Sequence, residues 1–236
     1  QYEAEEKITV NGNVDLYAVV FNRTTETDLT EDQLPQVDIY KYKQVIFVGD
    51  SRTEFMENVL TGMGESATKN VKFVCSAGKG LDWFTTTGWA QLYSIVQHDS
   101  NSILSKKTAV IFNFGVNDLS TSADYAEYYN WIAPQLKSKG CELYFMSVNP
   151  VNRLMLPNAG RADRSEAAVR SFNQYMKANL SSAYTYIDMY SYLKSTGYSF
   201  ASDHYGTGTV DDGLHYTTRT YKRIFAKCMD SLRVPA

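Results

Sequence analysis

The sequence predicts an α/β fold in which helices cover both faces of a five-stranded parallel sheet. Two observations support this class. From Tyr42 onward, short apolar runs alternate with longer segments of helical periodicity, which is the pattern of parallel strands joined by crossover helices. Apolar runs also lead directly into polar turns that contain Gly, Asp, Asn or Ser, as expected where buried strands end in loops.

The elements can be placed in order along the chain. The expected strands are five apolar segments, at residues 44–48, 71–76, 109–114, 142–148 and 184–187. The expected helices lie between these strands and at the end of the chain, at residues 53–60, 89–97, 123–137, 164–179 and 217–232. In the fourth helix the apolar residues fall at three- and four-residue spacing, which predicts one face directed at the core. These residues are Ala168, Phe172, Tyr175, Met176 and Leu180.

Composition narrows the class of protein. The chain has 236 residues, of which 44% are hydrophobic and 21% charged, as in an ordinary globular protein. The formal net charge of −3 gives no basic surface for nucleic acid, and no apolar run approaches the roughly 18 residues of a membrane span. Cys75, Cys141 and Cys228 are odd in number and lack metal-ligand spacing, so we expect buried free thiols, no metal site and no cofactor.

The first forty residues differ from the rest. Residues 7–20 alternate apolar and polar side chains around an Asn-Gly pair, which predicts a β-hairpin. This hairpin resembles the closing strands of internalin-type β-repeats in bacterial surface proteins, and the resemblance implies a secreted or cell-surface protein cut from a longer chain. Alternatively, the hairpin packs on the domain that follows. Residues 22–40 are polar and are expected to form a linker or a surface wrap, which divides the chain into residues 1–40 and 41–236.

A serine follows the first expected strand at its carboxyl end. The apolar residues 45–48 run into Gly49, Asp50 and Ser51 just before a helix. A serine at such a turn lies where open α/β sheets bind ligands, close to the unpaired amide N–H groups of the helix start. Considered alone, Ser51 could simply cap the helix.

Two later segments favour a catalytic role for this serine. Asn117 follows the third expected strand, and Asp212 and His215 precede the last helix. A serine hydroxyl is a poor nucleophile unless a base accepts its proton and a third group orients that base. An aspartate three residues before a histidine can fold back on the imidazole and hold its tautomer. The alternative is an acidic residue that only stabilises the start of the helix.

The three segments together resemble the SGNH, or GDSL-type, hydrolase family. Residues 49–51 match its first block, residues 115–118 its third and residues 212–215 its fifth, and the resemblance extends from residue 45 to residue 232. It implies a flavodoxin-like three-layer α/β/α sandwich. It also implies a metal-free serine hydrolase in which Ser51 attacks, His215 moves the proton and Asp212 orients the histidine.

Hydrolysis of an ester also needs donors for the developing oxyanion. The expected donors are the backbone N–H of Ser51, the side-chain amide of Asn117 and the N–H of a glycine after the second strand. The resemblance implies a glycine there, and its distance from the strand end favours Gly78, although Gly80 is also possible.

Substrate contacts are predicted at two positions. Arg52 stands where the family name has leucine, so this position bears on the substrate, unless the arginine only forms a surface ion pair. Trp83 lies at the carboxyl edge of the sheet and would suit a sugar ring, although tryptophan is more often a core anchor. We therefore expect a serine esterase that removes a short acyl group, such as O-acetyl, from a carbohydrate or cell-wall glycan.

Two other functions use the same sequence features. An O-acyltransferase would need the same residues, with a sugar hydroxyl in place of water at the second step. A glycan-binding module of a surface protein would need no catalytic residues at all, so the set of Ser51, Asn117, Asp212 and His215 argues against it. In each case the expected partner is a small molecule or a glycan ester.

Overall fold

The computed structural model describes residues 28–37, 41–99, 107–156, 164–201, 206–207 and 211–232. Its five-stranded sheet is parallel throughout and has the order β2-β1-β3-β4-β5. The strands are β1 (Tyr42–Gly49), β2 (Val71–Cys75), β3 (Lys107–Asn113), β4 (Cys141–Met146) and β5 (Tyr184–Ile187). The predicted parallel α/β class is confirmed, and each predicted strand is found within two residues of its expected bounds.

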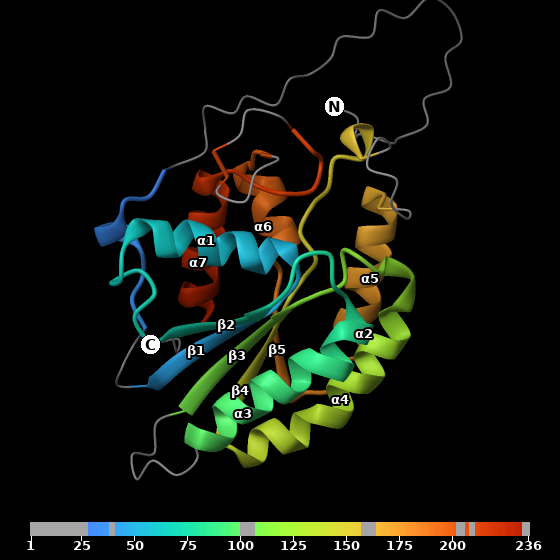
Figure 1. Ribbon diagram of the computed structural model, residues 1–236. Helices are drawn as coiled ribbons and strands as arrows, with labels where there is room; N and C mark the ends of the chain where they lie inside the picture. Colours follow the sequence, from blue (N-terminus) through green and yellow to red (C-terminus); the bar gives the residue numbers. More distant parts are fainter. Residues whose placement is uncertain are drawn as a thin grey trace, which may run out of the picture.

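Helices cover both faces of the sheet (Figure 1). On one face lie α1 (Ser51–Met63), α6 (Met189–Thr196) and α7 (Thr218–Ser231). On the other lie α2 (Leu81–Trp83), α3 (Trp89–Asp99), α4 (Ser122–Ser138) and α5 (Glu166–Asn179). Short helical turns complete the described chain, at η2 (Glu31–Gln33), η3 (Phe84–Gly88), η4 (Leu119–Thr121) and η5 (Arg153–Met155).

Alternation along β1 divides the core into two layers. Val45 and Phe47 pack among the residues beneath α1 and α7, whereas Ile46 and Val48 pack on the side of α3, α4 and α5. All four side chains are fully buried, as expected for a central parallel strand. Because the sequence order reverses beside β1, the carboxyl ends of β1 and β3 meet at the topological switch point of the sheet, where open α/β sheets bind ligands.

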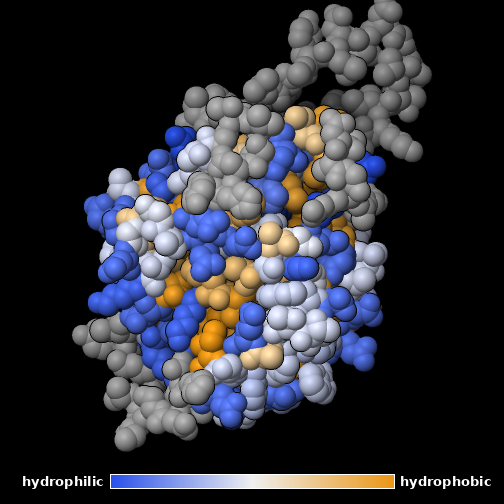
Figure 2. All heavy atoms as spheres, in the orientation of Figure 1, coloured by the Kyte–Doolittle hydropathy of each residue, from blue (hydrophilic) through white to orange (hydrophobic). Residues whose placement is uncertain are grey.

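Strand β2 forms one edge of the sheet, and its side chains Val71 and Phe73 are only partly buried. In the orientation of Figure 1, apolar residues gather in the middle of the molecular face, between more hydrophilic regions (Figure 2). This region is where β2 lies between α1 and α3 in Figure 1. The edge strand is therefore less completely covered than the central strands.

Two helix predictions need correction. In α5 the buried residues are Glu166, Val169, Phe172, Asn173 and Met176, whereas Tyr175 is 39% exposed. The core face of this helix therefore includes Val169 instead of Tyr175. Helix α6 is absent from the predicted elements. It has only eight residues, and its Ser, Lys and Thr side chains interrupt the apolar pattern that would indicate a helix.

Part of the polar N-terminal connector packs on the sheet domain. Leu34 and Val37 are buried in the layer that also contains residues of α1 and α7, which fits a surface wrap better than a free linker. The hairpin expected at residues 7–20 lies outside the described residues. Its resemblance to a surface repeat, the secreted or cell-surface location and the domain division at residue 40 all stay predictions.

The described helices include none that is long and apolar enough to cross a membrane. The three cysteines are free thiols; Cys141 and Cys228 are buried, and Cys75 is partly buried.

Candidate active site

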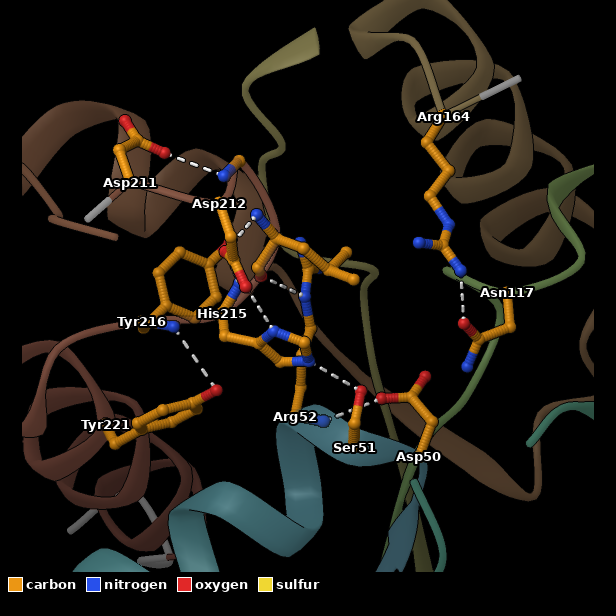
Figure 3. A network of polar contacts seen from close by, with 12 residues as sticks. Asp50, Ser51, Arg52, Asn117, Arg164, Asp211, Asp212, His215, Tyr216 and Tyr221 are labelled. Carbon is orange, nitrogen blue, oxygen red and sulfur yellow. Dashed lines mark hydrogen bonds and ion pairs between the residues drawn. The ribbon is translucent and has the colours of Figure 1, made fainter. Parts of the chain in front are cut away.

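Ser51, His215 and Asp212 form a chain of hydrogen bonds at the carboxyl end of β1 (Figure 3). The Ser51 Oγ lies 2.9 Å from His215 Nε2, and His215 Nδ1 lies 2.6 Å from Asp212 Oδ2. Ser51 is the first residue of α1, but the N-cap of this helix is Asp50, whose side chain accepts from the Arg52 N–H. The fold therefore brings Ser51 next to the distant loop of Asp212 and His215, and the serine hydroxyl is not needed as a helix cap.

The carboxylate of Asp212 fixes both the backbone and the ring of His215. Its Oδ1 accepts hydrogen bonds from the amides of Leu214 and His215, at 2.9 and 2.8 Å, while its Oδ2 faces the ring. Burial raises the pKa of this carboxyl, but the hydrogen bonds from His215 and Leu214 outweigh burial and hold the pKa below its usual value. Asp212 does not cap α7, because that role belongs to Thr217.

These contacts select one tautomer of the imidazole. An ionised carboxylate can only accept hydrogen bonds, so Nδ1 carries the proton and Nε2 is left to accept the proton of the Ser51 hydroxyl. The ring also stacks on Phe55 of α1, with 4.3 Å between the ring centroids. The histidine is therefore positioned as a general base toward Ser51.

The loop that carries the aspartate and the histidine is fastened to the segment after β4. Gly213 has a φ of +71°, and a Cβ at this position would lie 2.2 Å from the backbone oxygen of Asn152. The Asn152 N–H donates to the Gly213 carbonyl at 2.8 Å, and its side chain donates to Asp211 at 3.1 Å. The glycine in the sequence Asp-Gly-Leu-His is thus required by a close approach between two backbones.

Arg52 connects two loops of the site from a buried position. Its side chain is only 2% exposed, and its guanidinium donates to three backbone carbonyls. The acceptors are those of Leu214, Asn149 and Pro150, at 2.8–2.9 Å. The expected surface ion pair is wrong, because the side chain is buried and these donors tie the histidine loop to the loop after β4. The substrate contact stays a prediction.

Asp50 is a buried carboxyl next to the expected nucleophile. It is 1% exposed, and burial raises its pKa to about 6, despite the opposing effects of the Arg52 N–H and of the positive charge of Arg52. Since the unfolded carboxyl titrates near pH 4, the folded state binds the extra proton between about pH 4 and 6. The stability that this proton provides is present below about pH 4 and is lost as the pH rises through 6.

We expect Asp50→Asn to remove this pH dependence. Asparagine keeps the oxygen that caps α1 and carries no buried charge. Relative to the native chain, the variant should gain about 3 kcal/mol in free energy of unfolding between pH 4 and pH 8. Urea unfolding at both pH values measures this gain, and Asp188→Asn, at the exposed N-cap of α6, is the matched control. A difference that does not change with pH would contradict the prediction.

The expected oxyanion donors lie on two loops that contact each other. The Asn117 Nδ2 donates to the Lys79 carbonyl at 2.7 Å, and the Leu81 N–H donates to Asp118 at 2.8 Å. A Cβ on Gly80 would lie 2.2 Å from Asp118, so this glycine permits the contact. Gly78 has a φ of +71°. Either glycine can still supply a backbone N–H, and the oxyanion roles of Ser51, Gly78 and Asn117 stay predictions.

Trp83 is partly buried and packs against the core. Its ring centroid lies 6.1 Å from that of Phe114, and the ring closely approaches Gly88. The indole is thus held mainly by apolar neighbours, and its contact with substrate stays a prediction. Within the described ranges, no group of three or more His, Cys, Asp or Glu side chains could hold a metal ion.

One residue of this region, Arg164, does not appear among the sequence-based candidates. Its guanidinium donates to the Val116 carbonyl at 2.9 Å and to the Oδ1 of Asn117. In the sequence it is only an arginine at the start of an expected helix, a position where arginine is usually exposed. No motif or spacing distinguishes it.

Comparisons with known proteins agree with the fold and with the predicted family. Residues 45–228 match the model of a family described as GDSL-like lipase/acylhydrolase. A search of curated proteins gives no match.

Solved structures with the same fold share little sequence with this chain. A Slackia heliotrinireducens protein assigned as an SGNH hydrolase has a TM-score of 0.56 and 12% identity, over 82% of this chain and 100% of that one. A Bacteroides fragilis protein assigned as an acylhydrolase has a TM-score of 0.52 and 16% identity, over 85% of this chain and 92% of that one. An acetyl xylan esterase has a TM-score of 0.51 and 11% identity, over 80% of this chain and 100% of that one. Identities this low support a common fold only.

Proposed function

Because the chain belongs to the GDSL-like lipase/acylhydrolase family, we propose that it is a serine esterase with Ser51 as its nucleophile. The observation that carries the proposal is the continuous chain of contacts from Asp212 through His215 to the Ser51 Oγ, at 2.6 and 2.9 Å. Nucleophile, base and orienting carboxylate are each within hydrogen-bond reach, as this chemistry requires.

The geometry supports a two-step reaction. The Ser51 Oγ attacks the ester carbonyl carbon while its proton passes to His215 Nε2, and Asp212 stabilises the resulting imidazolium. The negative charge on the former carbonyl oxygen is met by N–H donors, for which we propose the Ser51 amide, the Asn117 side chain and a glycine amide. The intermediate then expels the alcohol, which takes the proton from His215. Water attacks the acyl-enzyme in the same way and releases the acid and free Ser51.

We further propose that the acyl group is short. Ser51 is only 5% exposed and lies between the stacked ring of His215 and the buried Asp50, so little open space surrounds the nucleophile. A short acyl ester on a carbohydrate, such as O-acetyl on a glycan, fits this surrounding. We therefore expect acetate esters to be hydrolysed faster than octanoate esters of the same alcohol.

Covalent trapping tests the proposed nucleophile. Diethyl p-nitrophenyl phosphate should release one equivalent of p-nitrophenol, abolish hydrolysis of p-nitrophenyl acetate and leave a diethylphosphoryl group on Ser51, because attack of Oγ on phosphorus expels p-nitrophenol and leaves a phosphate ester that water hydrolyses only slowly. Mass spectrometry of the peptide that contains Ser51 locates the adduct. A label on another side chain, or hydrolysis that survives full labelling, would refute the proposed nucleophile.

Product analysis separates hydrolysis from acyl transfer. With acetylated xylan in water, an esterase releases free acetate at the same rate whether or not a soluble glycan acceptor is added. Loss of acetate release together with acetylation of the acceptor would identify the transferase instead.

A further inference from the structure

Arg164 is a buried cation on the opposite side of Ser51 from His215 (Figure 3). Arg164 is 5% exposed and directly precedes Ser165, the N-cap of α5. Its contacts there include the Val116 carbonyl, at 2.9 Å from Nε, and the Oδ1 of Asn117. It therefore contacts both the backbone and the side chain of the loop that carries the expected oxyanion donor.

We propose that Arg164 is a positioning residue that fixes the amide of Asn117 as a donor to the oxyanion. This inference rests on the proposed esterase function. It assigns to Arg164 no contact with the substrate.

The contacts of Asn117 permit only one orientation of its amide. Arginine has no acceptor and a backbone carbonyl has no donor. The oxygen must therefore face Arg164, and the nitrogen must face the Lys79 carbonyl, 2.7 Å away. Rotating the amide by 180° would break both hydrogen bonds. Nδ2 has two protons, and the Lys79 carbonyl uses one, so the other is left for a developing negative charge.

The charge of Arg164 also strengthens this donor. A hydrogen bond from a cation to Oδ1 draws electron density from the amide and makes its N–H groups more positive. Among the described residues, the Lys79 carbonyl is the side-chain amide's other hydrogen-bond partner, so loss of the guanidinium would weaken the hold on this orientation. Preorganised donors are effective because they do not reorganise during the reaction.

The start of α5 fixes the backbone from which the Arg164 side chain extends. Ser165 caps this helix by accepting from the Ala168 N–H at 3.1 Å, and Glu166 accepts from the Val151 N–H at 2.9 Å. The backbone next to Arg164 is thus fixed to both the helix and the loop after β4. A side chain supported in this way can transmit a defined geometry to Asn117.

A double-mutant cycle tests whether Arg164 acts through Asn117. The four proteins are the native chain, Arg164→Met, Asn117→Ala and the double variant, assayed with p-nitrophenyl acetate. We expect Arg164→Met to lower kcat about 10- to 100-fold with KM changed less than about 3-fold, since loss of one complete donor costs about 10²- to 10³-fold. In the Asn117→Ala background the same change should lower kcat less than about 3-fold.

Arg223→Met is the matched control for loss of a buried arginine. Arg223 is 6% exposed, and it donates to the carbonyls of Gly197 and Thr196 at the end of α6. This variant should lose thermal stability without the fall in kcat. Arg164→Lys, which keeps a charge and a donor, should recover part of the activity lost in Arg164→Met.

The outcomes separate the two proposals. The positioning role is wrong if the native chain hydrolyses the ester but Arg164→Met lowers kcat by the same factor in the native and the Asn117→Ala backgrounds. It is also wrong if Arg164→Met and Arg223→Met have the same kcat. In both cases the esterase proposal stands. If the native chain hydrolyses no ester and is not labelled at Ser51, both are wrong.

Discussion

Replacing Ser51 with alanine is expected to lower kcat for p-nitrophenyl acetate by about 10⁴-fold or more. The variant has no serine nucleophile, so the remaining groups can act only on water. Loss of the hydrogen bond to His215 should cost only about 1 kcal/mol of stability. Helix α1 keeps its cap, because the cap is Asp50. Steady-state rates and a urea unfolding curve on the same preparation measure both quantities.

A serine of α6 provides the control for this substitution. Ser191 is exposed and its hydroxyl donates to Asp188 at 3.0 Å, so Ser191→Ala removes one side-chain hydrogen bond outside the site and should leave kcat unchanged. Activity of Ser51→Ala within about tenfold of the native chain would contradict the proposed mechanism. Contamination by another serine esterase is recognised with diethyl p-nitrophenyl phosphate, which would then abolish the residual activity while releasing far less than one equivalent of p-nitrophenol.

The fold was accessible from the sequence because its signals are local. Residues 45–48 are uniformly apolar and end at Gly49 and Asp50, and this pattern marks a buried strand followed by a turn without any knowledge of its neighbours. The same holds for the strand before Asn117. Once parallel strands are inferred, their carboxyl ends must lie at one edge, so the common location of the loops that carry Ser51 and Asn117 follows from topology.

The roles of two arginines were not accessible in the same way. Arg52 and Arg164 bind mainly backbone carbonyls, such as those of Leu214 and Val116. Every residue has a backbone carbonyl, so the amino-acid sequence does not indicate which carbonyl accepts a hydrogen bond from an arginine. An arginine beside a nucleophile suggests a substrate contact, yet the guanidinium of Arg52 is buried and donates to three carbonyls of the surrounding loops. Only the tertiary structure decides between these outcomes.

The second large effect is expected for Asp212→Asn, which should lower kcat by about 10⁴-fold. Asparagine can still offer an oxygen to the amides of Leu214 and His215, so the loop should keep its shape. An amide N–H facing the ring, however, requires Nδ1 to accept, and the ring proton then moves to Nε2. A histidine in that tautomer cannot take the proton of the Ser51 hydroxyl, and the imidazolium formed in the reaction loses its neighbouring negative charge.

Asp211→Asn is the matched control for this loss, because the neighbouring carboxylate binds the Gly213 amide at 2.7 Å and the Asn152 side chain at 3.1 Å but not the imidazole. It should cost some stability and less than about tenfold in kcat. A loss confined to stability in both variants would mean that Asp212 only shapes the loop. A loss of kcat in Asp212→Asn alone, with an unfolding curve close to that of the native chain, would instead assign the effect to the tautomer and charge of His215.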